Sequence, residues 1–265
     1  MRRLMAILAH PDDESMGFGG TLAKYAAEGV EIAVVCATRG DSGRYMGHPA
    51  GDPAHPGPAR LAAIREQELH AAAGVLGVSD VVLLDYRDQH LDRADAAEIV
   101  PLLAGHIRRF RPDVVLTFGP DGAYGHPDHI AISQFATASV VAAARATDSA
   151  HAVSKLYYLA WPAAAWAAFE AAFRRLVSSV DGQERQALPW PDWAITTVLD
   201  TRASWETAWR AVSCHQSQVT AYSRLRELSA AHLEALWGWQ SFYRAFSTVN
   251  GGRTREADLF EGLPQ

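Results

Sequence analysis

Two short segments of this chain concentrate side chains that could bind a metal ion or transfer protons. Residues 9–14 read AHPDDE, and residues 125–129, far downstream, read GHPDH. Each segment follows an apolar run that is typical of a buried strand, at 4–9 and at 113–118. Burying so many ionisable groups is costly unless a cation or a partner compensates. We therefore expect the two segments to meet in space and to hold a metal ion.

The side-chain types in these segments suit a catalytic metal. Two imidazoles and one carboxylate, with a water in the fourth position, are common ligands of catalytic zinc. Neutral imidazole and carboxylate also suit iron, so the ligand types alone leave Fe²⁺ or another divalent metal open. The segments offer more donors than a four-coordinate ion accepts: His10, Asp12, Asp13, His126, Asp128 and His129. Spacing does not say which of them bind, but a carboxylate left beside the metal would be placed as a general base.

A simpler interpretation of the first segment is a helix cap. Aspartate is a common N-cap, so Asp12 or Asp13 could cap the helix that follows, with His10 as a polar strand end. That interpretation does not explain why His-Pro-Asp recurs in the second segment. Pro11 and Pro127 fix their own φ and favour an extended conformation in the preceding histidine, which stiffens the backbone beneath potential ligands.

Apolar strands alternate with helical patterns over the first 150 residues. We expect strands at 4–9, 30–38, 81–84 and 113–118, and helices at 17–28, 60–76, 94–109 and 127–145. This alternation predicts an α/β fold, a Rossmann-like three-layer α/β/α arrangement around a mainly parallel sheet. Such sheets bind ligands beyond the carboxyl ends of their strands, which is where both polar segments fall.

After residue 150 the pattern is less regular. We expect strands at 155–161, 194–199 and 242–249, helices at 163–176, 203–217 and 225–237, and a loop near 181–193. Our interpretation is a single domain over 1–265, with an α/β core at 1–150 and a C-terminal elaboration at 151–265 that forms part of the substrate pocket. The loop at 39–59 is long for a compact domain, which is typical of a functional or mobile segment.

Composition narrows the class of protein. The chain has 265 residues, 49% of them hydrophobic, which is enough for a substantial core. A net charge of -6 argues against a general nucleic-acid or anionic-membrane binder. No apolar stretch is long enough for a transmembrane helix, and the short one at the start predicts a first strand rather than a signal peptide. Two cysteines without paired spacing fit a cytoplasmic protein without disulfides or a cysteine zinc site.

The two polar segments together resemble the LmbE-like (PIG-L) family of zinc-dependent N-acetyl-sugar deacetylases, which includes deacetylases and amidases of mycothiol and bacillithiol metabolism. Further similarities lie at 38–43 (TRGDSG), at the helix with Arg65 and Glu66, and at 215–218 (HQSQ). The resemblance covers most of the chain. It is strongest over 4–145.

The resemblance implies a division of roles among the polar residues. By this similarity, His10, Asp13 and His129 would hold one Zn²⁺ per chain. Asp12 would be the general base, and Asp128 would orient a histidine ligand.

The same resemblance implies two groups that face the substrate carbonyl. His126 would be an acid or electrostatic group, and Tyr124 matches a position where some members place a tyrosine that stabilises the oxyanion. Weaker candidates for contacting substrate or bracing the site are Glu14, Asp41, Arg65, Asp88 and His215. A solvated or structural role is an equal alternative for several of these, and His215 could equally be a core residue on a helix. All eight tryptophans lie at or after Trp161, and we expect most of them in core or oligomer packing.

The resemblance implies a hydrolase that removes the N-acetyl group from an N-acetylglucosamine-containing small molecule, such as a precursor of a low-molecular-weight thiol, by attack of metal-activated water. An amidase that cleaves thiol S-conjugates is the main alternative, since both reactions are amide hydrolyses. A catalytically silent sugar-binding protein is the non-enzyme alternative, and the spare carboxylate of Asp12 argues against it. Homo-oligomerisation is left open.

Two other functions fit the pattern less well. A dinucleotide-binding loop would need a third glycine where the sequence has Leu22, after Gly17 and Gly19. A non-haem iron oxygenase of the jelly-roll type is disfavoured, because the strands alternate with helices.

Overall fold

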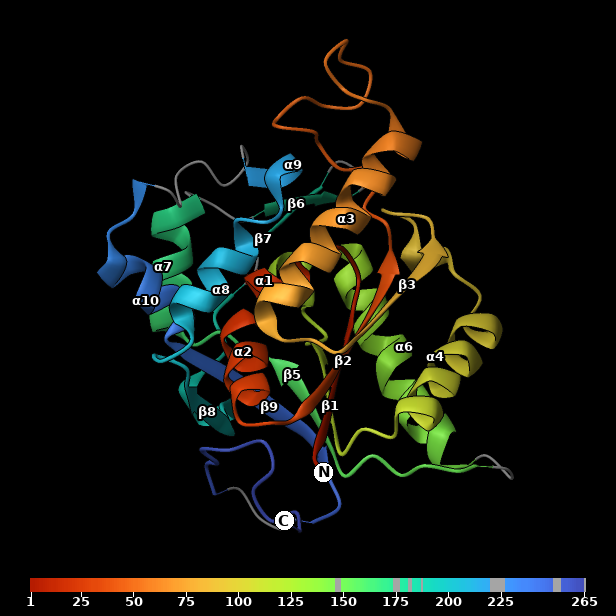
Figure 1. Ribbon diagram of the computed structural model, residues 1–265, viewed down its shortest axis with the longest axis vertical. Coiled ribbons are helices and arrows are strands. Elements are labelled where there is room, and N and C mark those ends of the chain that lie inside the picture. Colours follow the sequence, from red (N-terminus) through yellow and green to blue (C-terminus); the bar gives the residue numbers. More distant parts are fainter. Residues whose placement is uncertain are drawn as a thin grey trace.

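A seven-stranded sheet with strands from both halves of the chain forms the centre of the fold (Figure 1). The computed structural model describes residues 1–145, 149–173, 177–180, 183–186, 188–219, 227–249 and 254–264. The strand order is β3-β2-β1-β4-β5-β9-β8. The strands are β1 (Arg3–Leu8), β2 (Glu31–Thr38), β3 (Asp80–Tyr86), β4 (Val114–Phe118), β5 (Lys155–Leu159), β8 (Thr197–Asp200) and β9 (Trp239–Ser247).

Most neighbouring strands of this sheet are parallel. β1 pairs in parallel with β2 and with β4, and the outer pairs β2–β3 and β4–β5 are parallel as well. Within this sheet β9 runs antiparallel to both β5 and β8. The predicted α/β fold with a mainly parallel sheet is confirmed. The order reverses between β1 and β4, so the segments that follow these two strands meet at the crevice where such folds bind ligands.

Helices cover both faces of the sheet. α2 (Gly19–Ala27), α3 (Pro58–Leu76) and α8 (Trp205–Val212) pack together, and α4 (Ala96–Phe110) packs on α6 (Pro127–Ala144) (Figure 1). The shorter elements are α1 (Asp13–Met16), η1 (Leu91–Arg93), α5 (Gly122–Gly125), α7 (Ala163–Phe173), the hairpin of β6 (Val177–Val180) and β7 (Gln183–Gln186), η2 (Asp192–Ala194), α9 (Gln216–Val219) and α10 (Ala230–Trp237). Of the helices in the described ranges, none is both long and apolar enough to cross a membrane.

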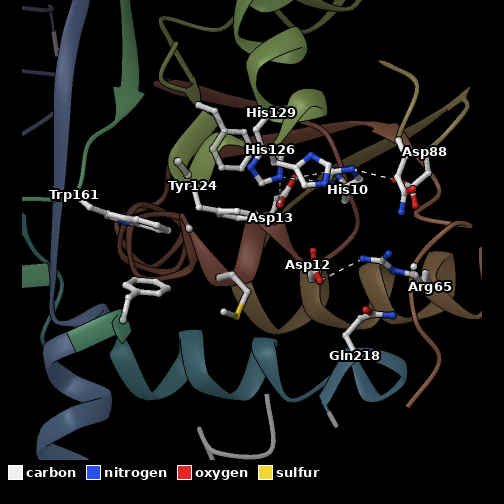
Figure 2. A pocket seen from close by; sticks show the side chains of 17 residues that line it. His10, Asp12, Asp13, Arg65, Asp88, Tyr124, His126, His129, Trp161 and Gln218 are labelled. Carbon is white, nitrogen blue, oxygen red and sulfur yellow. Dashed lines mark hydrogen bonds and ion pairs between the residues drawn. The ribbon is translucent and has the colours of Figure 1, made fainter. Parts of the chain in front are cut away.

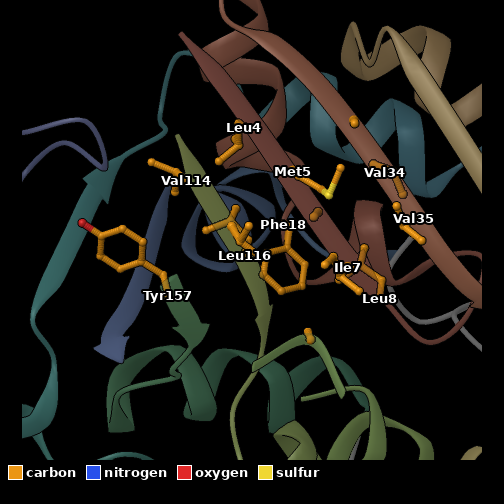
Figure 3. Packing of buried hydrophobic residues seen from close by; sticks show 14 of the residues in the cluster. Leu4, Met5, Ile7, Leu8, Phe18, Val34, Val35, Val114, Leu116 and Tyr157 are labelled. Atoms are coloured by element: carbon orange, nitrogen blue, oxygen red, sulfur yellow. The ribbon is translucent and has the colours of Figure 1, made fainter. Parts of the chain in front are cut away.

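The central strands are apolar throughout because both of their faces are covered. Residues 4–8 of β1 are fully buried, and they pack beside Val34 and Val35 of β2 and Leu116 of β4 (Figure 3). Phe18 closes this core at its carboxyl edge, with its ring edge-on to Phe118 at 5.7 Å. The core thereby gives a rigid base to the two polar segments.

The C-terminal third differs from the prediction in three places. The loop expected near 181–193 contains β7, whose polar sequence lacks the alternation that marks a half-buried strand. The helix expected over 203–217 ends at Val212, so His215 lies in the turn before α9 rather than on a helix. β9 begins at Trp239, earlier than expected. The start of the helix expected at 225–237 lies partly outside the described residues.

A buried ionic cluster attaches the C-terminal segment to the sheet. Glu256 is 2% exposed, and its carboxylate accepts hydrogen bonds from Lys155 Nζ at 2.8 Å, Tyr157 OH at 2.6 Å and Thr197 Oγ1 at 3.0 Å. Arg244 Nη1 lies 2.6 Å from the same carboxylate. A carboxylate removed from water depends on such partners, so this cluster is sensitive to the loss of any one member.

We expect Glu256→Ala to lower the free energy of unfolding by about 3–5 kcal/mol, because it leaves two buried cations without their carboxylate. Chemical denaturation measures this change. Asp200, whose ion pair with Arg202 is exposed, provides the control: Asp200→Ala should leave the unfolding midpoint unchanged. An equal loss of unfolding free energy in the two variants would show that the buried cluster stabilises the fold no more than the exposed ion pair does.

Candidate active site

The segments after β1 and β4 meet and form one pocket, as the sequence predicts (Figure 2). Its volume is about 260 Å³, which suits a small molecule. Its polar lining comes from both segments and from three other elements: His10, Asp12, Asp13, Tyr124, His126 and His129, with Arg65, Asp88, Gln89 and Gln218.

Donor atoms of three side chains converge at the base of the pocket, and Asp13 takes part with both of its oxygens. His10 Nδ1 lies 3.2 Å from His129 Nε2, which lies 3.2 Å from Asp13 Oδ1. His10 Nδ1 and Asp13 Oδ2 are 3.7 Å apart. Tetrahedral ligands at zinc-like bond lengths lie about 3.3 Å from one another. The spacing of these three side chains therefore fits a metal ion bound between them.

The backbone of the first segment orients Asp13. Its Oδ2 accepts hydrogen bonds from the N–H groups of Ala9 at 3.1 Å and His10 at 2.8 Å, which leaves Oδ1 directed at His129. Burial opposes ionisation, but the electrostatic attraction of the nearby His129 ring and its hydrogen bond hold the pKa of Asp13 well below its usual range. Asp13 is thus a carboxylate anion, the form that a metal ligand needs.

Other groups fix the two histidine rings. His10 Nε2 lies 3.1 Å from Asp128 Oδ2 and 3.2 Å from Asp88 Oδ1, and these carboxylates raise the pKa of His10 although burial lowers it. His129 Nδ1 lies 3.3 Å from the carbonyl oxygen of Gly122. Each ring therefore has one nitrogen toward an acceptor and the other toward the donor cluster, as metal-binding histidines generally do.

Among the described residues, two groups of three side chains place one donor atom each within 4.8 Å of one another, and neither includes Asp13. One is His10 with Asp88 and Asp128, and the other is His10 with His126 and His129. Asp128 is poorly available, because its two oxygens accept the N–H groups of Gln89 at 2.7 Å and Leu91 at 3.0 Å. His126 is the stronger competitor for Asp13 as the third ligand, so the predicted ligand set stays a prediction.

Asp12 occupies the N-cap position of α1, but its side chain makes no capping hydrogen bond. The helix-cap interpretation therefore does not account for its carboxylate, which lines the pocket. Asp12 Oδ2 lies 3.3 Å from Arg65 Nη2. Burial raises the pKa of Asp12 even though Arg65 opposes the shift, and a carboxylate with a raised pKa is a better proton acceptor.

Arg65 connects the TRGDSG segment to the first polar segment. Its Nη1 donates to the carbonyl oxygen of Gly40 at 2.9 Å, and its Nη2 donates to the carbonyl oxygen of Pro11. Gly40 has a φ of +63°, and a Cβ atom there would collide with the guanidinium group of Arg65. Glycine is required at this position for both reasons.

Tyr124 and His126 form the opposite wall of the pocket. Burial, together with the charges of Asp13 and Asp12, raises the pKa of Tyr124, so its hydroxyl stays protonated and can donate a hydrogen bond. His126 caps α6: its Nδ1 accepts the N–H of Asp128 at 3.2 Å. Burial and the charges of His10 and His129 lower the pKa of His126 to about 3. The neutral ring then carries its proton on Nε2.

Of the weaker candidates, the structure brings Arg65 and Asp88 to the pocket. Glu14 and His215 lie behind it, fully buried and paired, with His215 Nε2 2.7 Å from Glu14 Oε1. The pocket wall that the described residues form does not include Asp41, which is half-buried in the loop after β2.

The sequence of this chain matches a known protein family over about half of its length. Residues 5–140 match the PIG-L family, described as GlcNAc-PI de-N-acetylase. The chain belongs to this family. The membership confirms the resemblance that the two polar segments indicate.

The sequence similarity to the relatives below extends over 99% of this chain. A 1D-myo-inositol 2-acetamido-2-deoxy-alpha-D-glucopyranoside deacetylase from Rhodococcus jostii is 35% identical over 99% of this chain and 98% of its own. The protein of the same name from Thermomonospora curvata is 35% identical over 99% of this chain and 97% of its own. Among solved structures, the conserved protein TT1542 from Thermus thermophilus has a TM-score of 0.66 and 25% identity, covering 96% of this chain and 100% of that one.

Sequence reasoning missed the apolar end of the pocket in this PIG-L protein. Trp161, Phe169 and Met16 line it, and Figure 2 shows Trp161 at the end opposite Arg65 and Asp88. Trp161 follows β5, so its place beyond the carboxyl end of a third parallel strand could have identified it. The tryptophans do not share one role: Trp237 is fully buried in the core, whereas Trp193 is 83% exposed.

Metal content distinguishes the competing ligand sets. We expect His129→Ala to abolish stoichiometric metal binding and His126→Ala to retain it, because His129 Nε2 lies within 3.2 Å of donor atoms of both His10 and Asp13. Asp128→Asn, which weakens the acceptor of the His10 ring, should lower metal affinity by roughly 10–100-fold. Elemental analysis after dialysis measures all three. Metal loss in His126→Ala would instead make His126 a ligand, as in the group of His10, His126 and His129.

Proposed function

We propose that this protein is a metal-dependent N-deacetylase that removes the acetyl group from a small molecule containing N-acetylglucosamine. The observation that carries the proposal is the carboxylate of Asp12, which lines the pocket beside the His10, Asp13 and His129 donors without capping its helix. The near full-length similarity to relatives named as deacetylases supports the same reaction.

The donor set fits Zn²⁺ best, and Fe²⁺ is the alternative. His10, Asp13 and His129 would hold the ion. A divalent metal there supplies Lewis-acid polarisation of the amide oxygen and lowers the pKa of water to about 7.

Asp12 acts as the general base under this proposal. Its carboxylate takes a proton from the water that attacks the acetyl carbon, and its raised pKa favours that transfer. The protonated Asp12 can then return this proton to the amine that leaves, which restores the carboxylate for the next cycle. Arg65, whose Nη2 lies 3.3 Å from Asp12 Oδ2, holds the carboxylate in the pocket.

Tyr124 and His126 stabilise the charge that develops on the acetyl oxygen. The Tyr124 hydroxyl is a donor because its pKa is raised. His126 Nε2–H is a donor because Nδ1 already accepts a backbone hydrogen bond. Of the two roles that the resemblance implies for His126, acid and electrostatic group, this tautomer favours the second. A preorganised donor of this kind typically contributes about 10²–10³ in rate.

The two ends of the pocket suit different parts of a substrate. The end with Arg65, Asp88 and Gln218 presents groups that bond sugar hydroxyls, and the end with Trp161 and Phe169 is apolar. An amidase for thiol S-conjugates would use the same catalytic groups, and a silent sugar-binding protein would use the same polar end. The position of Asp12 favours hydrolysis over silent binding.

We expect Asp12→Asn to lower kcat by about 10²–10⁴-fold with unchanged metal content, because it removes the general base while it leaves the three donors in place. Acetate release and elemental analysis on the same sample measure both quantities. Metal loss combined with normal turnover of the loaded fraction would assign Asp12 to the metal instead.

A substrate panel decides between the reactions. N-acetylglucosaminyl-inositol, other N-acetylglucosaminides and a thiol S-conjugate should be assayed for free amine with the metal-loaded protein. We expect the N-acetylglucosaminides to be hydrolysed. Cleavage of the S-conjugate alone would establish the amidase, and saturable binding without any hydrolysis would establish a sugar-binding protein.

A further inference from the structure

Glu14 and His215 form a fully buried pair directly behind the pocket. His215 Nε2 lies 2.7 Å from Glu14 Oε1, which also accepts a hydrogen bond from Ser15 Oγ at 2.5 Å. Among the described residues His215 Nδ1 has no partner, so the ring is directed at Glu14 and Ser15 alone. Neither member of the pair lines the pocket, and neither is placed to touch a substrate.

The second oxygen of Glu14 connects this pair to Asp12. Glu14 Oε2 accepts the backbone N–H of Asp12 at 2.9 Å. Asp12 has a φ of 116° and a ψ of -23°, a backbone conformation that residues with a side chain rarely adopt. Such a conformation persists only where surrounding groups hold it in place, and it occurs mainly at functional sites.

The carbonyl oxygen of Pro11, which belongs to the same peptide group as the Asp12 N–H, is also hydrogen-bonded. Pro11 O accepts a hydrogen bond from Arg65 Nη2, while Asp12 N–H bonds Glu14 on the other side. Both polar atoms of the Pro11–Asp12 peptide group are therefore bonded to buried charged side chains from different helices. The peptide plane cannot rotate without breaking one of these bonds, so they hold the backbone from which the Asp12 side chain projects.

We propose that Glu14, supported by His215, is a positioning residue that holds the strained backbone of Asp12 and thereby aims its carboxylate into the pocket. This inference rests on the proposed function, in which Asp12 is the base. It gives a catalytic consequence to a residue of the C-terminal third that never contacts the substrate. His215 keeps Glu14 oriented, Glu14 keeps Asp12 oriented, and Asp12 transfers the proton.

The test compares three substitutions at Glu14 in the full-length, metal-loaded protein. Glu14→Ala removes the acceptor for Asp12 N–H and should lower kcat by about 10²-fold with unchanged KM and metal content, since a displacement of about 1 Å is sufficient for such a loss. Glu14→Gln keeps a carbonyl oxygen in reach and should retain most of kcat. Glu14→Asp keeps the charge but is too short to reach both Asp12 and His215, so it should lose kcat while it folds.

Two substitutions at His215 provide a matched comparison. His215→Gln can still donate to Glu14 and should stay near the wild-type rate, whereas His215→Ala should fall toward Glu14→Ala. Glu256→Gln is the control for loss of a buried carboxylate elsewhere, because Lys155 and Tyr157, which bond Glu256, do not line the pocket. It should reduce the unfolding midpoint and leave kcat unchanged.

Combining substitutions separates positioning from a structural role. If Glu14 acts through Asp12, the double variant Asp12→Asn, Glu14→Ala is no slower than Asp12→Asn alone. A further loss in the double variant, a normal kcat in Glu14→Asp, or metal loss in every Glu14 variant would each overturn the proposal.

A crystal structure of Glu14→Asp supplies a measurement independent of activity. We expect the Pro11–Asp12 peptide to rotate and the Asp12 φ to leave the positive range. An unchanged peptide would overturn the positioning role whether or not the protein is a deacetylase. Failure of the wild-type protein to hydrolyse any amide would refute the proposed function alone, and this structural result would still decide the role of Glu14.

Discussion

Buried charge governs this structure, because carboxylates and imidazoles at the carboxyl edge of the sheet are removed from water and must neutralise one another. His10 illustrates the constraint: one ring nitrogen faces Asp13 and His129, and the other faces Asp128 and Asp88. Each of these partners has further backbone hydrogen bonds of its own. The result is one connected network in which no member can turn independently, and this rigidity is what a preorganised site requires.

The sheet decides where this network forms, and segments outside the sheet complete it. The reversal of strand order between β1 and β4 brings together two polar segments that no local interaction joins. Arg65 then enters from α3, Gln218 from α9 and Trp161 from the end of β5. The pocket is consequently polar at one end and apolar at the other, although the central strands themselves are uniformly apolar.

The predictable features were those encoded locally or by the topology of parallel sheets. The apolar runs of the strands from β1 to β5, and the convergence of His10 and His129, follow from periodicity and from the rule for carboxyl ends. The β6–β7 hairpin was not predicted because neither VSSV nor QERQ alternates apolar and polar residues. The partner of Glu14 could not be predicted, because His215 lies 201 residues away and the helical pattern around it conceals the turn in which it sits.

The contact between Glu14 and His215 also has a consequence for how the protein is made. Glu14 leaves the ribosome well before His215, because 201 residues separate them in the sequence. A nascent chain can therefore form β1 to β4 and bring His10 and His129 together while Glu14 still lacks its histidine partner. During synthesis, the part of the pocket built from β1 to β4 can thus assemble before the contact between Glu14 and His215 exists.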